Sequence, residues 1–357
     1  MKVLRLRAKT QIWSLVFIFF VLTGCAHQYN MLPANQTPSL QNVRQVYVSG
    51  PFQTQVYVGA KTPKIVMTTD QSNAQAKVIV KQYADVLQVQ PTLSSSLSSV
   101  KHVILKIYVK NLTNLSIENA NVVRIYSSPR ANFVLNVRNT GYVVLDGGAV
   151  LPVLNLNNVG NFDAVDGPVY LNEVNFTGPG NVYIDNIAGG YVSINAVGPG
   201  YLKLNGNFKL ISIVQQGGNL LDLSGNIQGG NITLKTNGDR HIRMNGIAFI
   251  GLQFEAYGKD DIELSGYVGQ LNAALYGSSV LDGKFLTVQK AYVKTYDQAT
   301  ANFYVSQSIF AKALNQSRIT YSGSPIYRYA YAKNSAAILP ISPPTPNALN
   351  KGGWSIQ

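Results

Sequence analysis

The sequence predicts an all-β protein, a parallel β-helix or β-solenoid with coils of about twenty residues. A short segment of alternating apolar and polar residues, followed by a glycine, recurs through the middle of the chain. Its clearest copies end at Gly206, Gly225, Gly246 and Gly266, in steps of 19, 21 and 20 residues. A second glycine series, over residues 141–277, keeps steps of 18 to 20 residues. A fixed period near twenty indicates a repeat architecture.

Each repeat also has the pattern of a half-buried strand. Leu202 and Leu204 flank Lys203, which is the period-2 alternation of a strand with one face in the core. Asn-Gly, Asp-Gly and Ser-Gly pairs follow, and these residues favour turns. We therefore expect two short strands and two turns per coil, with stacked coils sharing one core. Leu204, Leu223, Met244 and Leu264 are expected to form one inward column of this core. A β-sandwich with regular turns is the alternative, but it gives no reason for side chains to keep register every twenty residues.

The solenoid is expected to span residues 43–330 as one domain. An open solenoid end exposes strand edges and core, so each end needs a cap. The candidates are an N-terminal hairpin over residues 46–58 and a C-terminal segment over residues 326–339. Residues 331–357 are rich in proline and are expected to form a tail.

The first residues have the pattern of a signal peptide. Lys2, Arg5, Arg7 and Lys9 precede an apolar stretch over residues 12–22, which is too short to span a membrane. Residues 1–24 are therefore expected to be removed. An ordinary secretory signal is one alternative at this position.

The end of this segment resembles the lipobox of bacterial lipoproteins, because it reads Leu22-Thr23-Gly24-Cys25. The resemblance implies cleavage before Cys25 and acylation of its thiol and new N-terminus, with palmitate or similar chains. Two or more chains anchor a protein stably to a membrane. Ala26 in place of Asp implies sorting to the outer membrane. Cys25 is the only cysteine, so no disulfide within one chain is possible. Residues 25–42 are expected to be the lipidated cysteine and a tether.

Composition supports an exported β protein. Only 13% of the residues are charged, and the chain is rich in Gly and Tyr. Without the four basic residues of the signal peptide, 25 basic residues face 16 acidic ones, a net charge of about +9. Nucleic acid is not an expected partner, because the signal peptide exports the chain.

Two motifs lie at the ends of the domain: residues 46–59 read VYVSGPFQTQVYVG, and residues 317–325 read SRITYSGSP. They resemble the bacterial putative auto-transporter adhesin head domain, also called the GIN domain. The resemblance covers residues 43–327. The array here is longer than usual, and Gly-Pro-Gly turns replace the customary Ser-Gly-Ser-Gly. The family implies a β-helical envelope domain and brings no known catalytic residues.

Two polar columns follow from the repeat. Lys203, Asp222, Arg243 and Glu263 each lie between inward residues, so they are expected to form an outward column of alternating charge. The column could serve a β-helical polysaccharide lyase, but register and stability are the favoured roles. Turn residues form the second expected column, a hydrogen-bonded ladder. Its members are Asp146, Asp166, Asn186, Asn205, Ser224, Asn245, Ser265 and Asp282.

No cofactor, metal or catalytic group is expected. His27, His102 and His241 are too scattered for metal-ligand spacing, and Asp239 with Asp260-Asp261 gives only a weak calcium pattern. The sequence has no nucleophile elbow and no phosphate loop with a following helix.

Basic and aromatic residues toward the C-terminus are the candidate binding site. The six basic candidates are Lys284, Lys290, Lys294, Lys312, Arg318 and Arg328. Tyr327, Tyr329 and Tyr331 alternate, so they share one strand face; they could stack on a sugar or contact a partner, although packing in the cap is the favoured role. The expected partner is an anionic polymer, lipopolysaccharide or an acidic glycan, or an envelope protein assembly. The charge excess could instead only maintain solubility.

These observations predict an outer-membrane lipoprotein with a non-catalytic β-solenoid for binding or scaffolding, in adhesion or envelope assembly. The alternative is a β-helical polysaccharide lyase or glycoside hydrolase. Such an enzyme needs unlike catalytic residues walled by long loops, whereas the turns here are short.

Overall fold

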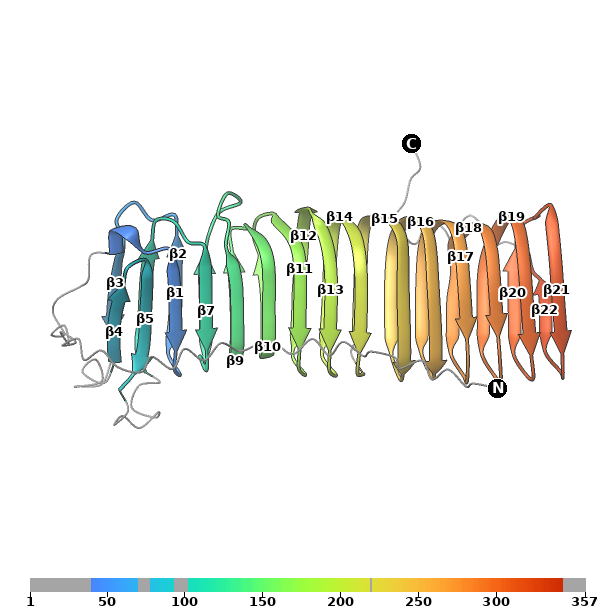
Figure 1. The fold of residues 1–357 in the computed structure, drawn as a ribbon, viewed down its shortest axis with the longest axis horizontal. Coiled ribbons are helices and arrows are strands. Elements are labelled where there is room, and N and C mark those ends of the chain that lie inside the picture. The colour runs from blue at the N-terminus through green and yellow to red at the C-terminus, as the bar shows by residue number, and fades with distance from the viewer. Residues whose placement is uncertain (1–39, 70–77, 93–101, 219, 343–357) are drawn as a thin grey trace, which may run out of the picture.

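The protein forms a long rod of stacked β coils (Figure 1). This computed structural model describes residues 40–69, 78–92, 102–218 and 220–342. Within them lie one short 3-10 helix, η1 (Leu40–Asn42), and strands that join into one 22-stranded sheet. Among these residues no helix is long and apolar enough to cross a membrane. The predicted all-β solenoid is confirmed.

The strands of the N-terminal half are β1 (Gln45–Ser49), β2 (Gln53–Val58), β3 (Lys64–Thr68), β4 (Val78–Tyr83), β5 (Val86–Pro91), β6 (Ile104–Val109), β7 (Asn114–Glu118), β8 (Val122–Tyr126), β9 (Val134–Asp146), β10 (Ala149–Val165) and β11 (Val169–Thr177). Those of the C-terminal half are β12 (Asn181–Gly189), β13 (Tyr191–Val197), β14 (Tyr201–Gln216), β15 (Leu220–Gly238), β16 (His241–Gly258), β17 (Asp261–Leu275), β18 (Val280–Thr295), β19 (Thr300–Leu314), β20 (Arg318–Ser322), β21 (Tyr327–Lys333) and β22 (Ala337–Pro340).

A regular coil has three pairing segments rather than the expected two. In β16 they are residues 241–245, 247–249 and 251–258, which we call side 1, side 2 and side 3. Pairing is parallel on each side; the register shifts at the bend between sides 1 and 2, whereas at the bend between sides 2 and 3 the pairing only skips residue 250. The second bend, at residue 250 in this coil, carries no consistent Gly or Asn-Gly signal, so the sequence pattern does not show it.

The core is a set of inward columns that run along the rod. Leu204 pairs with Leu223, Leu223 with Met244, and Met244 with Leu264 on side 1. All four side chains are at most 2% exposed. The predicted inward column is therefore confirmed, and it lies beneath the predicted outward charges.

Glycine closes the bend between sides 1 and 2 because neighbouring coils approach closely there. Gly225 has φ +114°, and a Cβ at this position would meet the carbonyl oxygen of Gly206 in the preceding coil. Only glycine adopts this backbone without strain. The conformation and the close approach together explain the repeated glycine.

The N-terminal end is built out of chain order. The strands of the expected hairpin, β1 and β2, do not pair with each other: β1 lies between β5 and β7, and β2 between β6 and β8, all in parallel. Outside them, β4 pairs antiparallel with β5, and β3 pairs antiparallel with β6. Antiparallel strands thus close the regular parallel array at this end.

At the C-terminal end the chain adds a final rung. β21 pairs with β19 and β22 with β20, both in parallel. All seven residues of β21 are exposed. The segment expected as the C-terminal cap thus continues the sheets of sides 1 and 3, and β21 presents both of its faces to solvent.

Candidate functional site

The central outward column of side 3 changes chemistry along the rod. In the N-terminal half it is an asparagine ladder, where Asn155 donates to Asn136 at 2.7 Å and Asn175 donates to Asn155 at 2.8 Å. In the last coils the register neighbours are Tyr292, Phe310 and Tyr329. A self-satisfied amide ladder is a structural device, whereas exposed aromatic rings offer contact surface to a partner.

These aromatic rings form a ladder of their own. The ring centroids of Tyr292 and Phe310 are 5.0 Å apart with an interplanar angle of 4°, and those of Phe310 and Tyr329 are 6.3 Å apart at 31°. Their exposures are 38%, 41% and 59%. Because Tyr292 and Phe310 stack on each other, each ring covers one face of the other. The ladder therefore forms a partly exposed apolar ridge.

Lysines flank this ridge on both sides. Lys290 and Lys294 lie two residues before and after Tyr292 on β18, and Lys312 pairs in register with Lys294. None of the three forms an ion pair with a carboxylate in the described part of the chain. The structure thus brings together three of the six basic candidates.

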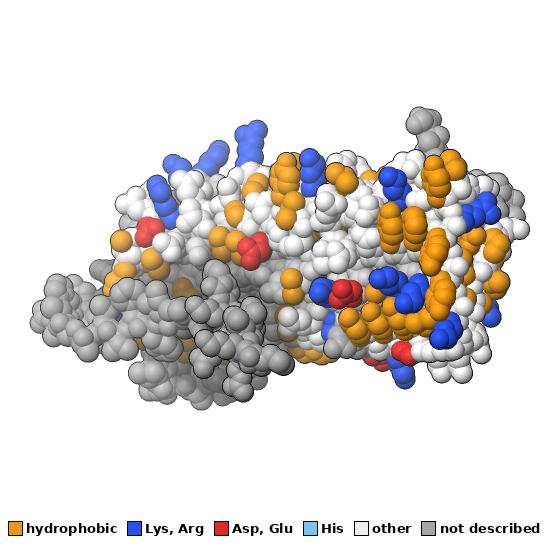
Figure 2. Space-filling view, turned by 45° about the vertical axis from the view of Figure 1, so that its right-hand side comes forward, with side chains coloured by type: hydrophobic (Ala, Val, Ile, Leu, Met, Phe, Trp, Pro, Cys, Tyr) orange, Lys and Arg blue, Asp and Glu red, His pale blue; other side chains and the backbone are white. Residues whose placement is uncertain are grey.

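We call the outward residues of side 3 in β17, β18, β19 and β21 the basic-aromatic face. They are Gln270, Asn272, Ala274, Lys290, Tyr292, Lys294, Phe310, Lys312, Tyr327, Tyr329 and Tyr331; Ser308 holds an outward register position but is buried. No Asp or Glu occurs among them. Figure 2 shows hydrophobic and basic side chains next to each other over the C-terminal part of the rod, with few acidic ones.

The three tyrosines of β21 lie on this face and are exposed, with Tyr327 at 69% and Tyr331 at 43%. Their favoured role in the sequence analysis was packing in a cap. Within the described residues they instead remain open to solvent, because β21 has no second strand beside it. Their alternation, which predicted a shared face, is confirmed by the register with β19.

The other basic candidates lie elsewhere. Lys284 is at the bend between sides 1 and 2 and pairs with Asp282 at 3.3 Å. Arg318 is exposed on side 1, in register with Thr300. Arg328 occupies an inward register position opposite Ile309, and its Nε donates to the carbonyl of Pro325 at 2.9 Å. Cys25, the expected lipidation site, lies outside the described residues.

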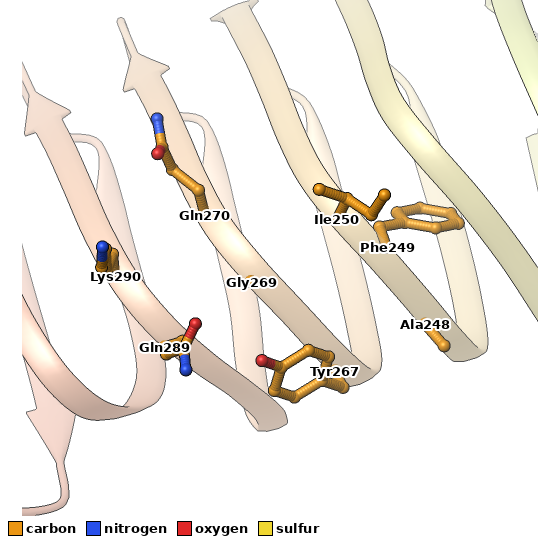
Figure 3. A pocket seen from close by; sticks show the side chains of 8 residues that line it. All are labelled: Ala248, Phe249, Ile250, Tyr267, Gly269, Gln270, Gln289 and Lys290. Atoms are coloured by element: carbon orange, nitrogen blue, oxygen red, sulfur yellow. The ribbon is translucent and has the colours of Figure 1, made fainter.

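A shallow depression of about 530 Å³ borders the face at the bend between sides 2 and 3 (Figure 3). Lys290 and Gln270 belong to both the face and the depression, and Ile250 and Tyr267 line the rest of its exposed rim. Its lining has no Asp, Glu or His, so it lacks a general acid or base pair of the kind that glycosidic bond cleavage uses.

The predicted charge column on side 1 is confirmed in register. Arg243 lies between Asp222, at 3.7 Å, and Glu263, at 2.8 Å. Lys203 instead pairs with Asp185 of the preceding coil at 2.8 Å. Tyr201 donates a hydrogen bond to Asp222 at 3.2 Å, and burial, followed by the charge of Asp222, raises the pKa of Tyr201 to about 12. Each charge has a neighbour of opposite sign, as a register-setting network requires.

The second predicted column is only partly formed. Ser224 donates to Asn205 at 3.2 Å and Ser265 donates to Asn245 at 3.1 Å, as expected. The prediction that Asn186 and Asp282 belong to this column is wrong, because the observed register places other residues opposite its members. Asp185 rather than Asn186 pairs with Asn205, and Asp282 pairs with Glu263 in the charge column. At the N-terminal end, Asp146 faces Val165 and not Asp166.

One histidine has acidic neighbours that linear spacing does not reveal. Nδ1 of His241 is 3.1 Å from a carboxylate oxygen of Asp261, and ligand atoms of these two residues and Glu263 all lie within 4.8 Å of one another. Such a group could bind a divalent cation. However, Arg243 already donates to Glu263 at 2.8 Å, so an ion-pair network accounts for the group.

The two adjacent carboxylates of the acidic turn considered for calcium differ in their burial. Asp260 is fully buried, whereas its neighbour Asp261 is exposed. Asp260 accepts from the Thr236 hydroxyl at 2.6 Å and from the Tyr257 backbone N–H at 3.2 Å. Burial raises the pKa of Asp260, and it lowers the pKa of nearby Arg240. The two carboxylates therefore do not face a common ion.

Sequence reasoning missed Tyr292 and Phe310, although a signal exists. Tyr292, Phe310 and Tyr329 are spaced by 18 and 19 residues, close to the repeat period. Counting back one period from Tyr329 reaches Phe310, and counting back a second period reaches Tyr292. Their common face depends on register shifts within β18 and β19, so the exact partners need the structure.

Comparisons with known proteins find one matching family model. The family whose model matches the chain is described as the putative auto-transporter adhesin, head GIN domain, and the matches cover residues 42–225 and 209–325. No curated protein matches the chain.

Three solved structures illustrate the similarity. A putative lipid binding protein from Parabacteroides distasonis has 15% identity and a TM-score of 0.29, with 86% of this chain and 96% of that chain covered. A putative adhesin from Bacteroides fragilis has 12% identity and a TM-score of 0.25, with 86% and 95% covered. A putative adhesin from Parabacteroides merdae has 11% identity and a TM-score of 0.26, with 86% and 95% covered.

Proposed function

We propose, from the premise that this chain belongs to the putative auto-transporter adhesin head GIN domain family, that it is a non-catalytic binding protein of the cell envelope. Lipid on Cys25 would anchor it to the outer membrane, and the rod would present the basic-aromatic face to an anionic polymer. Lipopolysaccharide and acidic glycans are the two candidates. The biological role would be adhesion or envelope assembly.

One observation supports this proposal. The basic-aromatic face, which has no acidic residues, places the aromatic ladder beside Lys290, Lys294 and Lys312. Lysine ammonium groups supply attraction to phosphate or carboxylate groups. The partly exposed rings supply apolar contact area that solvated lysines alone lack. A surface that served solubility only would need no such grouping of basic and apolar residues.

Adhesion suits this arrangement better than catalysis. The depression beside the face has no Asp, Glu or His among its lining residues. The carboxylates of side 1 are engaged by basic partners, as Arg243 shows. A face without carboxylates can hold a polymer but lacks the carboxylate pair that glycoside hydrolysis uses.

The test is binding of the soluble chain, residues 26–357, to immobilised lipopolysaccharide and acidic glycans. Charge reversal of Lys290, Lys294 and Lys312 to Glu should abolish binding, while reversal of Lys61, Lys106 and Lys110 near the N-terminal end, with the same net charge, should preserve most of it. Binding should weaken between 0.1 M and 1 M salt, where the screening length falls from about 10 Å to about 3 Å. Equal loss in both triple variants would contradict a localised site.

A further inference from the structure

One outward column of side 3 contains both an opposite-charge pair and a like-charge pair of register neighbours. Upstream, Lys235 and Glu255 are register neighbours and form an ion pair of 3.4 Å. Ala274 follows, and then Lys294 and Lys312 occupy neighbouring rungs. Neighbouring rungs are separated by about 4.8 Å. Two like charges are thus stacked with no acidic residue between them.

Among the other register neighbours of the described strands, like charges are compensated. Glu263 and Asp282 are also register neighbours of like charge, but each has its own cation. Arg243 pairs with Glu263 at 2.8 Å, and Lys284 pairs with Asp282 at 3.3 Å. Like charges directly opposite each other are destabilising in a sheet. The stacked lysines therefore mark a place where an anion from outside the chain would relieve repulsion.

We propose that Lys294 and Lys312 form a clamp for one phosphate group of the partner. This inference rests on the proposed function and names the chemistry that the basic-aromatic face recognises. A phosphate monoester carries a charge of about −1.5 to −2 and three acceptor oxygens, which matches two ammonium groups. A carboxylate carries one negative charge and would leave one of the two ammonium groups without a counter-charge. Lysine binds phosphate as a point charge, and the basic residues of the face are all Lys.

The position of the aromatic ladder indicates which class of molecule bears the phosphate group. Tyr292 and Phe310 lie in the adjacent outward column, two residues before Lys294 and Lys312 in their strands. Lys290 lies on the far side of Tyr292. A phosphate held by the clamp therefore has apolar rings beside it and a third ammonium group beyond them. This arrangement fits a phosphate ester on a sugar or lipid better than free inorganic phosphate.

The experiment compares four immobilised probes with the chain of residues 26–357, which contains every described residue. The probes are intact lipopolysaccharide, the same material after enzymatic dephosphorylation, polygalacturonate as a carboxylate-only polymer, and phosphatidylcholine vesicles containing phosphatidic acid. Intact lipopolysaccharide should bind at least about tenfold more tightly than the dephosphorylated material, since charged hydrogen bonds are lost. Binding to the vesicles as well would assign the site to lipid phosphate, and binding to lipopolysaccharide alone would assign it to a sugar phosphate.

Matched variants distinguish binding by the phosphate clamp from a general effect of the protein's positive charge. Lys294→Gln with Lys312→Gln should remove the preference for phosphate, whereas Lys61→Gln with Lys110→Gln should keep it. Equal binding of intact and dephosphorylated lipopolysaccharide, or tighter binding of polygalacturonate, would overturn the phosphate clamp and leave the proposed function standing. Absence of binding to all four probes would overturn both.

Discussion

Leu204 and Leu223 are register neighbours in one inward column of side 1, and both side chains are fully buried. The residues that precede them in the same strands, Lys203 and Asp222, are charged and point to the opposite, outward face. This alternation makes opposite predictions for inward and outward substitutions.

Leu223→Asp should strongly destabilise the protein. A carboxylate at this position would be buried without a partner, and the expected cost is about 3–5 kcal/mol in the free energy of unfolding. Lys203→Ala should cost less than about 1 kcal/mol, because its ion pair with Asp185 is partly solvated. Urea denaturation measures both. A tolerated Leu223→Asp beside a damaging Lys203→Ala would mean that the facing is inverted.

A second prediction concerns the bends. Gly225→Ala should cost at least about 1–3 kcal/mol, because Ala is strained at positive φ and its Cβ would meet the neighbouring coil. Gly230→Ala is the matched control, since a Cβ there meets nothing within 4 Å. Thermal melts of the two variants should differ clearly, and similar melting temperatures would remove close coil contact as the reason for the repeated glycine.

Much of this fold could be predicted because a period of twenty residues, period-2 alternation and turn glycines all report the same geometry. Leu204, Leu223, Met244 and Leu264 were placed correctly on that basis. The third segment of each coil was missed, since a bend at residues such as Ile250 has no distinctive turn chemistry. β5 and β6 come later in the chain than β1 and β2 but pair with them on the side toward the N-terminal end of the rod. This arrangement depends on long-range pairing, which local patterns do not encode.

The candidate site was predictable in part for similar reasons. The three tyrosines of β21 and three of the lysines were found from composition and alternation. Arg328 could have been excluded by parity, because it alternates with Tyr327 and Tyr329. Lys284 and Arg318 lie on other parts of the coil, and that assignment requires the positions of the bends.

A third prediction concerns pH and the buried Asp260. Burial raises its pKa in the folded state above the ordinary value of 3.8. Between 3.8 and the raised pKa, the folded state holds a proton that the unfolded state has lost, so stability contributed by this group falls as pH rises through that window. The unfolding free energy of Asp260→Asn minus that of the unsubstituted protein should therefore increase with pH. A difference that decreased with pH would show that Arg240 dominates and lowers this pKa.

The fourth prediction concerns the anchor. Cys25→Ala should abolish incorporation of labelled palmitate and move the protein out of the outer-membrane fraction, because Cys25 is the only cysteine in the chain. Fractionation with radiolabelled palmitate measures both effects. Continued labelling of the Cys25→Ala protein would rule out a lipoprotein anchor at this residue.

The most direct test of the central claim is to locate the contact on the rod. Because the chain of residues 26–357 has no cysteine, one introduced cysteine can carry an environment-sensitive fluorophore. Gln270→Cys places it on the basic-aromatic face, and Val280→Cys places it on side 1. Addition of lipopolysaccharide should change the fluorescence of the label at residue 270 and leave the label at residue 280 unchanged. A response at residue 280 alone, or equal responses at both positions, would contradict binding through the basic-aromatic face.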